Sequence, residues 1–200
     1  MQKHKGLLFF IWGSVASLIL MLIVLLFVGQ TIRSRGRLSV YGQVPDFSFV
    51  NQDGLPFGLS DMKGKIAVVD FIYTSCNEEC PLMSSKMTEL YTLFAKDGNV
   101  IFVSISVDPD RDSLRVLQEY AVNHGVSDDR WVFLWHPIEE IASLSEKGFL
   151  LSASDLPEGH SNRFILVDQN GQIRGYYDGT SDESMKLLEQ NIHQLLNKTR

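Results

Sequence analysis

Acidic residues are absent from the first 37 positions of this 200-residue chain, and no charge of either sign lies between Leu7 and Val28. That stretch, LLFFIWGSVASLILMLIVLLFV, is 22 residues long, enough for a helix to cross roughly 30 Å of hydrocarbon. A cleaved signal peptide has a shorter apolar region and a small-x-small cleavage site. The following FVGQTIRSRG has no such site and no cysteine to carry a lipid. We therefore expect an uncleaved transmembrane helix over residues 7–28.

Positive charge is scarce in the rest of the chain. Residues 38–200 contain 13 basic and 24 acidic residues, a net charge of about −11. A domain with this charge repels nucleic acid and anionic lipid, so we expect no nucleic-acid partner, whereas cations or basic partners would be attracted. No internal repeat, low-complexity tract or long linker interrupts the segment. We expect one soluble domain over residues 43–200, after a juxtamembrane linker at residues 29–42.

The pattern of apolar residues predicts an α/β domain with a mixed sheet. KIAVVDFIYTS, VIFVSISVD and the shorter WVFLW are typical of strands, and segments with helical spacing lie between them. A hairpin around Asp53-Gly54 precedes the first of these strands, and a later hairpin turns at Asn170-Gly171, which would supply positive φ angles. The last helix is amphipathic and opens on Thr180-x-x-Glu183, which resembles a capping box.

Only two cysteines occur, Cys76 and Cys80, in FIYTSCNEECPLM at the carboxyl end of the first buried strand. Open α/β sheets place their sites at such strand ends. Thiols one helical turn apart can form a disulfide or share a metal ion, and a helix amino terminus favours their thiolate form. Three interpretations remain. A structural disulfide would close too short a loop to stabilise the fold much. The others are a dithiol redox pair and a metal site that needs further ligands.

Two of the five histidines are candidates to complete a metal site. His136, in WHP, ends a strand near the same sheet edge, and His160 lies in the polar loop LPEGHSNRF before a strand. Met83 and Met87 follow the cysteines, but they lie on an apolar stripe at helical spacing. We predict that these two methionines pack in the core rather than bind metal.

Asp108 follows the second buried strand, in SVDPDRD, at the sheet edge that carries the cysteines. One interpretation makes its carboxylate an electrostatic or hydrogen-bonding neighbour of the site. The other is an Asp-Pro turn in which Asp110 or Asp112 caps the next helix.

Three segments resemble the SCO/SenC proteins: FIYTSCNEECP with its C-x-x-x-C-P, SISVDPDRDSLRVLQEYA, and GHSNRFILVDQNGQIRGYYDG. The similarity covers most of residues 43–195. It implies a thioredoxin-like fold with an N-terminal hairpin extension, and copper, as Cu(I), Cu(II) or both, bound by Cys76, Cys80 and His160. Asp108 would then be a neighbour of the copper site, and His136 a weaker alternative ligand.

The resemblance also implies a function. SCO/SenC proteins assist assembly of the dinuclear copper site of cytochrome c oxidase, either by delivering copper or by keeping the recipient's cysteines reduced. The expected partners are the copper-site subunit of the oxidase and a second copper chaperone. A metallochaperone is favoured over a true enzyme. The alternative is a thiol-disulfide oxidoreductase in which Cys76 and Cys80 are catalytic and copper is incidental.

Orientation in the membrane is not fixed by charge, because two lysines precede the apolar stretch and three arginines follow it. The family's role places the domain on the outer face of a bacterial plasma membrane, with residues 1–6 in the cytoplasm. The mitochondrial inner membrane is the second option.

Overall fold

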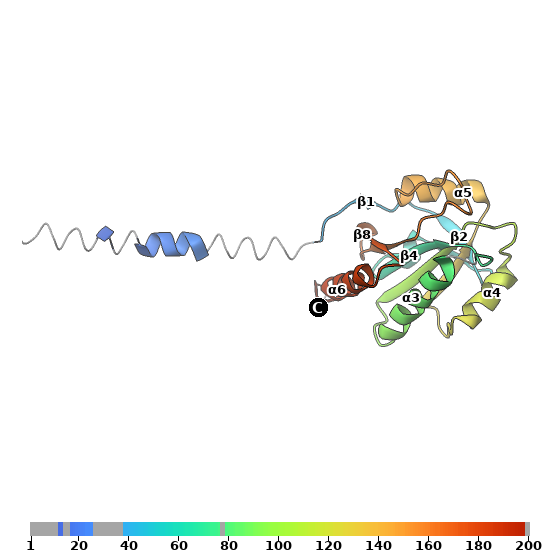
Figure 1. Cartoon of the computed structure of the whole chain (residues 1–200), viewed down its shortest axis with the longest axis horizontal. Coiled ribbons are helices and arrows are strands. Elements are labelled where there is room, and N and C mark those ends of the chain that lie inside the picture. Colours follow the sequence, from blue (N-terminus) through green and yellow to red (C-terminus); the bar gives the residue numbers. More distant parts are fainter. Residues whose placement is uncertain (1–11, 14–16, 26–37, 77–78, 199–200) are drawn as a thin grey trace, which may run out of the picture. The chain divides into compact units, whose positions relative to one another are not determined.

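The computed structural model describes residues 12–13, 17–25, 38–76 and 79–198 (Figure 1). The chain divides into two compact units, Met1–Leu38 and Ser39–Arg200. In the first unit, residues 17–25 are helical and all of them are solvent-exposed. Among the described residues, no helix combines the length and hydropathy needed to cross a membrane. Much of the predicted span, residues 7–28, lies outside the described residues.

In the described part of the second unit, eight strands form one sheet in the order β1-β8-β7-β4-β5-β6-β2-β3. The strands are β1 (Gly42–Gln43), β2 (Ser48–Asn51), β3 (Pro56–Gly58), β4 (Ile66–Ile72), β5 (Val100–Ser106), β6 (Trp131–Trp135), β7 (Arg163–Val167) and β8 (Gln172–Asp178). The helices are α2 (Leu59–Met62), α3 (Glu79–Leu93), α4 (Leu114–Asn123), α5 (Ile138–Ser143), the π-helical turn η1 (Leu144–Gly148) and α6 (Asp182–Lys198).

The sheet is mixed, as predicted. β4, β5 and β6 are parallel to one another, whereas β7 runs antiparallel beside β4 and β2 runs antiparallel beside β6. The predicted N-terminal hairpin is formed by β2 and β3. Its turn is stabilised by Asn51, whose Oδ1 accepts the backbone N–H groups of Asp53 and Leu55 at 3.0 and 2.9 Å.

Helices cover both faces of the sheet, with α5 on one side and α3, α4 and α6 on the other (Figure 1). All seven residues of β4 and all seven of β5 are buried, which explains their continuous apolar sequences. Ala67, Val69 and Phe71 of β4 belong to the core on the α5 side. Because strand side chains alternate, Asp70, which lies between Val69 and Phe71, points to the opposite face, toward the layer of α3, α4 and α6.

Two local details differ from the sequence prediction. In the turn between β7 and β8, Gly171 has a φ of +77°, but Asn170 is not in the positive-φ region. Asp168 explains this, because its Oδ1 accepts the N–H groups of Asn170 and Gln172 at 2.9 and 3.1 Å. These bonds hold the turn in a conformation in which Gly171, but not Asn170, has a positive φ.

The second difference is the start of α6. The helix begins at Asp182, and Ser181 Oγ accepts the N–H of Ser184 at 3.3 Å. Ser181 is therefore the cap. Thr180 instead donates its hydroxyl to Asp178 Oδ1 at 2.6 Å, so the predicted capping box is wrong by one residue.

Candidate metal centre

One edge of the sheet collects the predicted site residues. The carboxyl ends of the parallel strands β4, β5 and β6 meet there, and Cys76, Asp108 and His136 each follow one of these strands. The amino end of β7 lies at the same edge because β7 is antiparallel to β4, with Val69 opposite Ile165. His160 is three residues before β7. The topology thus brings all four loops to one side of the domain.

Cys76 lies directly after a turn that leaves β4. Its side chain is only 8% exposed, and its backbone N–H donates to the carbonyl oxygen of Tyr73 at 3.3 Å. Cys80 is the second residue of α3, and its side chain lies outside the described part of the chain. The first turn of a helix presents unpaired N–H groups and a positive partial charge, which favour a thiolate. The local structure therefore suits a reactive or metal-binding cysteine at position 80.

His160 is half-buried and packs against Tyr73. The two rings are edge-to-face, with centroids 5.3 Å apart and an interplanar angle of 88°. His160 Nδ1 lies 3.2 Å from the carbonyl oxygen of Ser161. An imidazole that donates from Nδ1 keeps its lone pair on Nε2, the usual arrangement in metal-binding histidines. Tyr73 therefore contacts His160 through its ring and Cys76 through its backbone.

His136 lies further from the cysteines in strand order. It follows β6, two strands from β4, a separation of about 10 Å, whereas β7 is the direct neighbour of β4 at about 5 Å. The His136 ring stacks on Phe49 of β2, with centroids 4.5 Å apart and an interplanar angle of 14°. Its Nδ1 is buried and has no hydrogen-bond partner within the described part of the chain. The strand order thus favours His160 over His136 as a companion of Cys76.

Asp108 is buried, and its carboxylate pairs with Arg111 at 3.2 Å. Its backbone N–H donates to Ser106 Oγ at 3.2 Å. The N-cap of α4 is Ser113, whose Oγ accepts the N–H of Val116 at 3.4 Å. The predicted Asp-Pro turn is present, since the N–H of Arg111 donates to the carbonyl of Asp108 at 3.0 Å, but the predicted cap from Asp110 or Asp112 is wrong.

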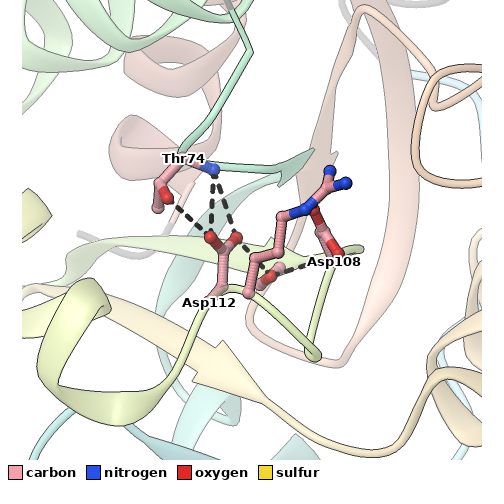
Figure 2. A network of polar contacts seen from close by, with 5 residues as sticks. Thr74, Asp108 and Asp112 are labelled. Atoms are coloured by element: carbon pink, nitrogen blue, oxygen red, sulfur yellow. Dashed lines mark hydrogen bonds and ion pairs between the residues drawn. The ribbon is translucent and has the colours of Figure 1, made fainter.

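Asp112 has a contact that the sequence did not suggest. Figure 2 shows its carboxylate beside Thr74, in the turn that precedes Cys76. Thr74 donates its hydroxyl to Asp112 Oδ1 at 2.5 Å and its N–H to Oδ2 at 3.1 Å. The two residues are 38 positions apart, so no local pattern reports their contact. In the sequence, the only sign of a role for Asp112 was its presence as one of several aspartates in the loop after β5.

Asp70 is a further buried acid, on β4 six residues before Cys76. Its side chain is 1% exposed, and neither carboxyl oxygen has a partner at hydrogen-bond geometry among the described residues. Desolvation by burial raises the pKa of Asp70 from 3.8 to about 7, although Ser104, opposite it on β5, offsets part of the shift. The middle of the sheet thus contains a carboxyl group that is largely neutral below about pH 7.

Comparison with known proteins decides the family. The SCO1/SenC family model matches residues 39–197, nearly the whole second unit. The chain belongs to the SCO1/SenC family. A SCO1 protein homolog from Bacillus subtilis is 36% identical over 150 residues, which cover 70% of this chain and 76% of the relative.

Solved structures of Sco proteins have the same fold. BsSco has a TM-score of 0.71 at 31% identity, covering 80% of this chain and 96% of that one. It is described as a member of the Sco family of cytochrome c oxidase assembly proteins in which a disulfide switch was identified. ScoI from Bradyrhizobium japonicum, solved with copper bound, has a TM-score of 0.59 at 23% identity and covers 74% and 98% of the two chains. The α/β fold with a mixed sheet therefore matches the thioredoxin-like Sco structures, as predicted.

The residues of this Sco protein fit a copper ion by donor type. A buried thiol and a half-buried imidazole adjoin Tyr73, and thiolate and imidazole are the soft donors that copper prefers. Among the side chains that the structure describes, no three histidine, cysteine or acidic residues are close enough to bind one metal ion. The third predicted donor, Cys80, has its side chain outside that set.

Proposed function

We propose that this protein binds copper through Cys76, Cys80 and His160 and assists assembly of the dinuclear copper site of cytochrome c oxidase. The observation that carries the proposal is the adjacency of β4 and β7, because these strands lead to Cys76 and from His160, and Tyr73 contacts both residues. Sco relatives described as oxidase assembly proteins, or solved with copper bound, support the same role. The protein acts as a metallochaperone rather than as an enzyme.

Two thiolates and one imidazole form a low-coordinate set suited to Cu(I), and such a set also holds Cu(II). Copper is here the cargo, to be transferred to the copper-site subunit of the oxidase after loading by another copper chaperone. Protons compete with copper for the thiolates and the imidazole, so acid weakens binding. A disulfide between Cys76 and Cys80 would use the same sulfurs and exclude copper.

The amino-terminal segment serves as a membrane anchor in this proposal. Residues 17–25, SLILMLIVL, are almost wholly apolar, and their helix is exposed on all sides. A helix that is apolar all round is stable when surrounded by an apolar medium, such as lipid. With residues 1–6 in the cytoplasm, the copper-binding domain would lie on the outer face of the plasma membrane, where the recipient site is exposed.

A thiol-disulfide oxidoreductase is the second candidate function. It is favoured by the position of Cys80 in the first turn of α3, where a thiolate is stabilised. It is also favoured by the disulfide switch described for BsSco. In this alternative the cysteine pair keeps the recipient's thiols reduced, and His160 is not needed for the chemistry.

The experiment that separates these functions is a copper titration of the reduced full-length chain in detergent. We expect one tightly bound Cu(I) per chain, measured by competition with a chromophoric chelator. His160→Ala should weaken binding by more than the roughly 10- to 100-fold that loss of a residue supporting a metal ligand costs. Dithiol exchange with glutathione should continue in this variant, because both cysteines remain.

His136→Ala is the matched control, since His136 also follows a strand that ends at the same sheet edge. Its copper affinity should equal that of the wild type. Weak copper binding that is indifferent to His160 would reject the proposed ligand set and favour the oxidoreductase.

A further inference from the structure

The Asp112 carboxylate is fully buried, yet no cation among the described residues pairs with it. Arg111, its sequence neighbour, pairs with Asp108 instead. Asp112 is satisfied by hydrogen bonds from two different segments. Thr74 donates its hydroxyl and its N–H, and Ser106 Oγ donates to Oδ2 at 2.6 Å (Figure 2). A buried carboxylate without such donors would be costly, and bonds to a charged acceptor are short and strong.

The hydrogen bonds form a chain from the β5 loop to the cysteine turn. The N–H of Asp108 donates to Ser106 Oγ at 3.2 Å, and the Ser106 hydroxyl donates onward to Asp112. The backbone N–H of Asp112 also donates to the carbonyl of Asp108 at 2.8 Å, which fixes the carboxylate on its own loop. Asp112 is therefore anchored to β5 independently of its contact with Thr74.

Thr74 belongs to the short turn between β4 and Cys76. Three residues separate the end of the strand from the cysteine: Tyr73, Thr74 and Ser75. Asp112 accepts both donors of Thr74, and Tyr73 accepts the N–H of Cys76. A contact within the turn and the contact from Asp112 thus both hold the conformation that presents Cys76.

We propose that Asp112 is a positioning residue for the cysteine pair, acting through Thr74 to fix the turn that presents Cys76 to copper. The inference rests on the proposed copper-binding function, because it assigns Asp112 a role in the affinity of that site. Helix capping does not explain Asp112, since Ser113 caps α4. In this proposal the buried hydrogen bonds of Asp112 select one geometry of the turn, as positioning requires.

The test uses the reduced full-length chain in detergent and three variants at the contact. Asp112→Asn replaces one acceptor oxygen by an NH₂ group, so it cannot accept all three bonds, from the Thr74 hydroxyl, the Thr74 N–H and the Ser106 hydroxyl. Thr74→Val removes only the hydroxyl and is the milder change if Asp112→Asn fails to fold. Both should weaken Cu(I) binding by about 10- to 100-fold, the usual effect of losing a residue that orients a metal ligand. Thr74→Ser keeps the hydroxyl and should restore wild-type affinity.

Ser113→Ala is the matched control for stability. It removes the cap of α4 from the same loop without touching Thr74. Its unfolding midpoint in urea should fall, as loss of a helix cap predicts, while its copper affinity stays within about two-fold of the wild type. If Thr74→Val weakens copper binding no more than Ser113→Ala, the positioning role is overturned.

A readout without copper separates this inference from the proposed function. Amide hydrogen exchange of the reduced, metal-free chain should accelerate at the amides of positions 74 and 76 in Thr74→Val but not in Ser113→Ala. If the wild type bound no copper tightly, the proposed function would fail, and local exchange would still report whether Asp112 holds the turn. Unchanged exchange at both amides would overturn the positioning role even if copper bound tightly.

Discussion

Asp70 lies on the central strand of the sheet with a pKa raised by burial to about 7. The carboxyl of the unfolded chain ionises at its ordinary pKa of 3.8, so the folded state holds an extra proton between these two values. The contribution of Asp70 to stability is therefore fully present below about pH 4 and is lost as pH rises through about 7. We expect Asp70→Asn to match the wild type at about pH 4. Its advantage in the free energy of unfolding should grow by roughly 1.4 kcal/mol per pH unit up to about pH 7.

Urea unfolding of both proteins across this range is the measurement. Asp178→Asn provides a control of opposite sign, because hydrogen bonds from the Thr180 hydroxyl and N–H lower the pKa of Asp178. A lowered pKa stabilises the fold above about pH 4 and stops doing so in acid, so any loss in this variant should shrink as pH falls. A constant difference between Asp70→Asn and the wild type at every pH would contradict the buried, neutral Asp70.

At the scale of secondary-structure elements, α3 contains Cys80 in its first turn and packs against the core through later residues. Met83 and Met87 are completely buried on its inner side, which confirms that they are core residues. Met87→Ala should lower the free energy of unfolding by about 2–5 kcal/mol, because it removes buried methylene groups and leaves a cavity. The stoichiometry of copper binding in the folded variant should be unchanged. Denaturant unfolding and copper titration measure the two effects.

Leu93→Ala, at the end of the same helix, is the matched control. Leu93 is 53% exposed, so the free energy of unfolding should change by about 0.5 kcal/mol at most. A loss of copper stoichiometry in Met87→Ala, at a concentration of denaturant where the chain is folded, would mean that Met87 takes part in the site.

The sequence predicted most elements because their signals are local. The buried strands β4 and β5 are continuous apolar runs, and the first hairpin turns at Asp53-Gly54. Contacts between distant segments could not be predicted in this way. The bond from Thr74 to Asp112 and the packing of Tyr73 on His160 depend on which strands become neighbours in the sheet. Sequence patterns therefore suggested individual site residues, but not the residues that hold them in place.

At the scale of the whole molecule, the proposed orientation puts residues 1–6 in the cytoplasm and the domain of residues 39–200 outside the plasma membrane. We expect protease added to intact spheroplasts to digest the domain, because its proposed position is outside the plasma membrane. A tag placed before residue 7 should survive in the cytoplasm. A cytoplasmic marker that stays intact is the control for leakage, and digestion after detergent treatment shows that the domain is cleavable. Full protection of the domain in spheroplasts would reverse the orientation.

The order of strands in the sheet differs from their order along the chain. β7 lies beside β4 but is synthesised after β5 and β6. In the proposed ligand set, the imidazole of residue 160 thus joins the thiols only after β7, which ends at Val167, has been made and has paired with β4. In the proposed orientation, a chain still in transit across the membrane would have both cysteines but not yet the third proposed ligand. Under this proposal, loading with copper would be a late event in the life of the protein, after its export and folding.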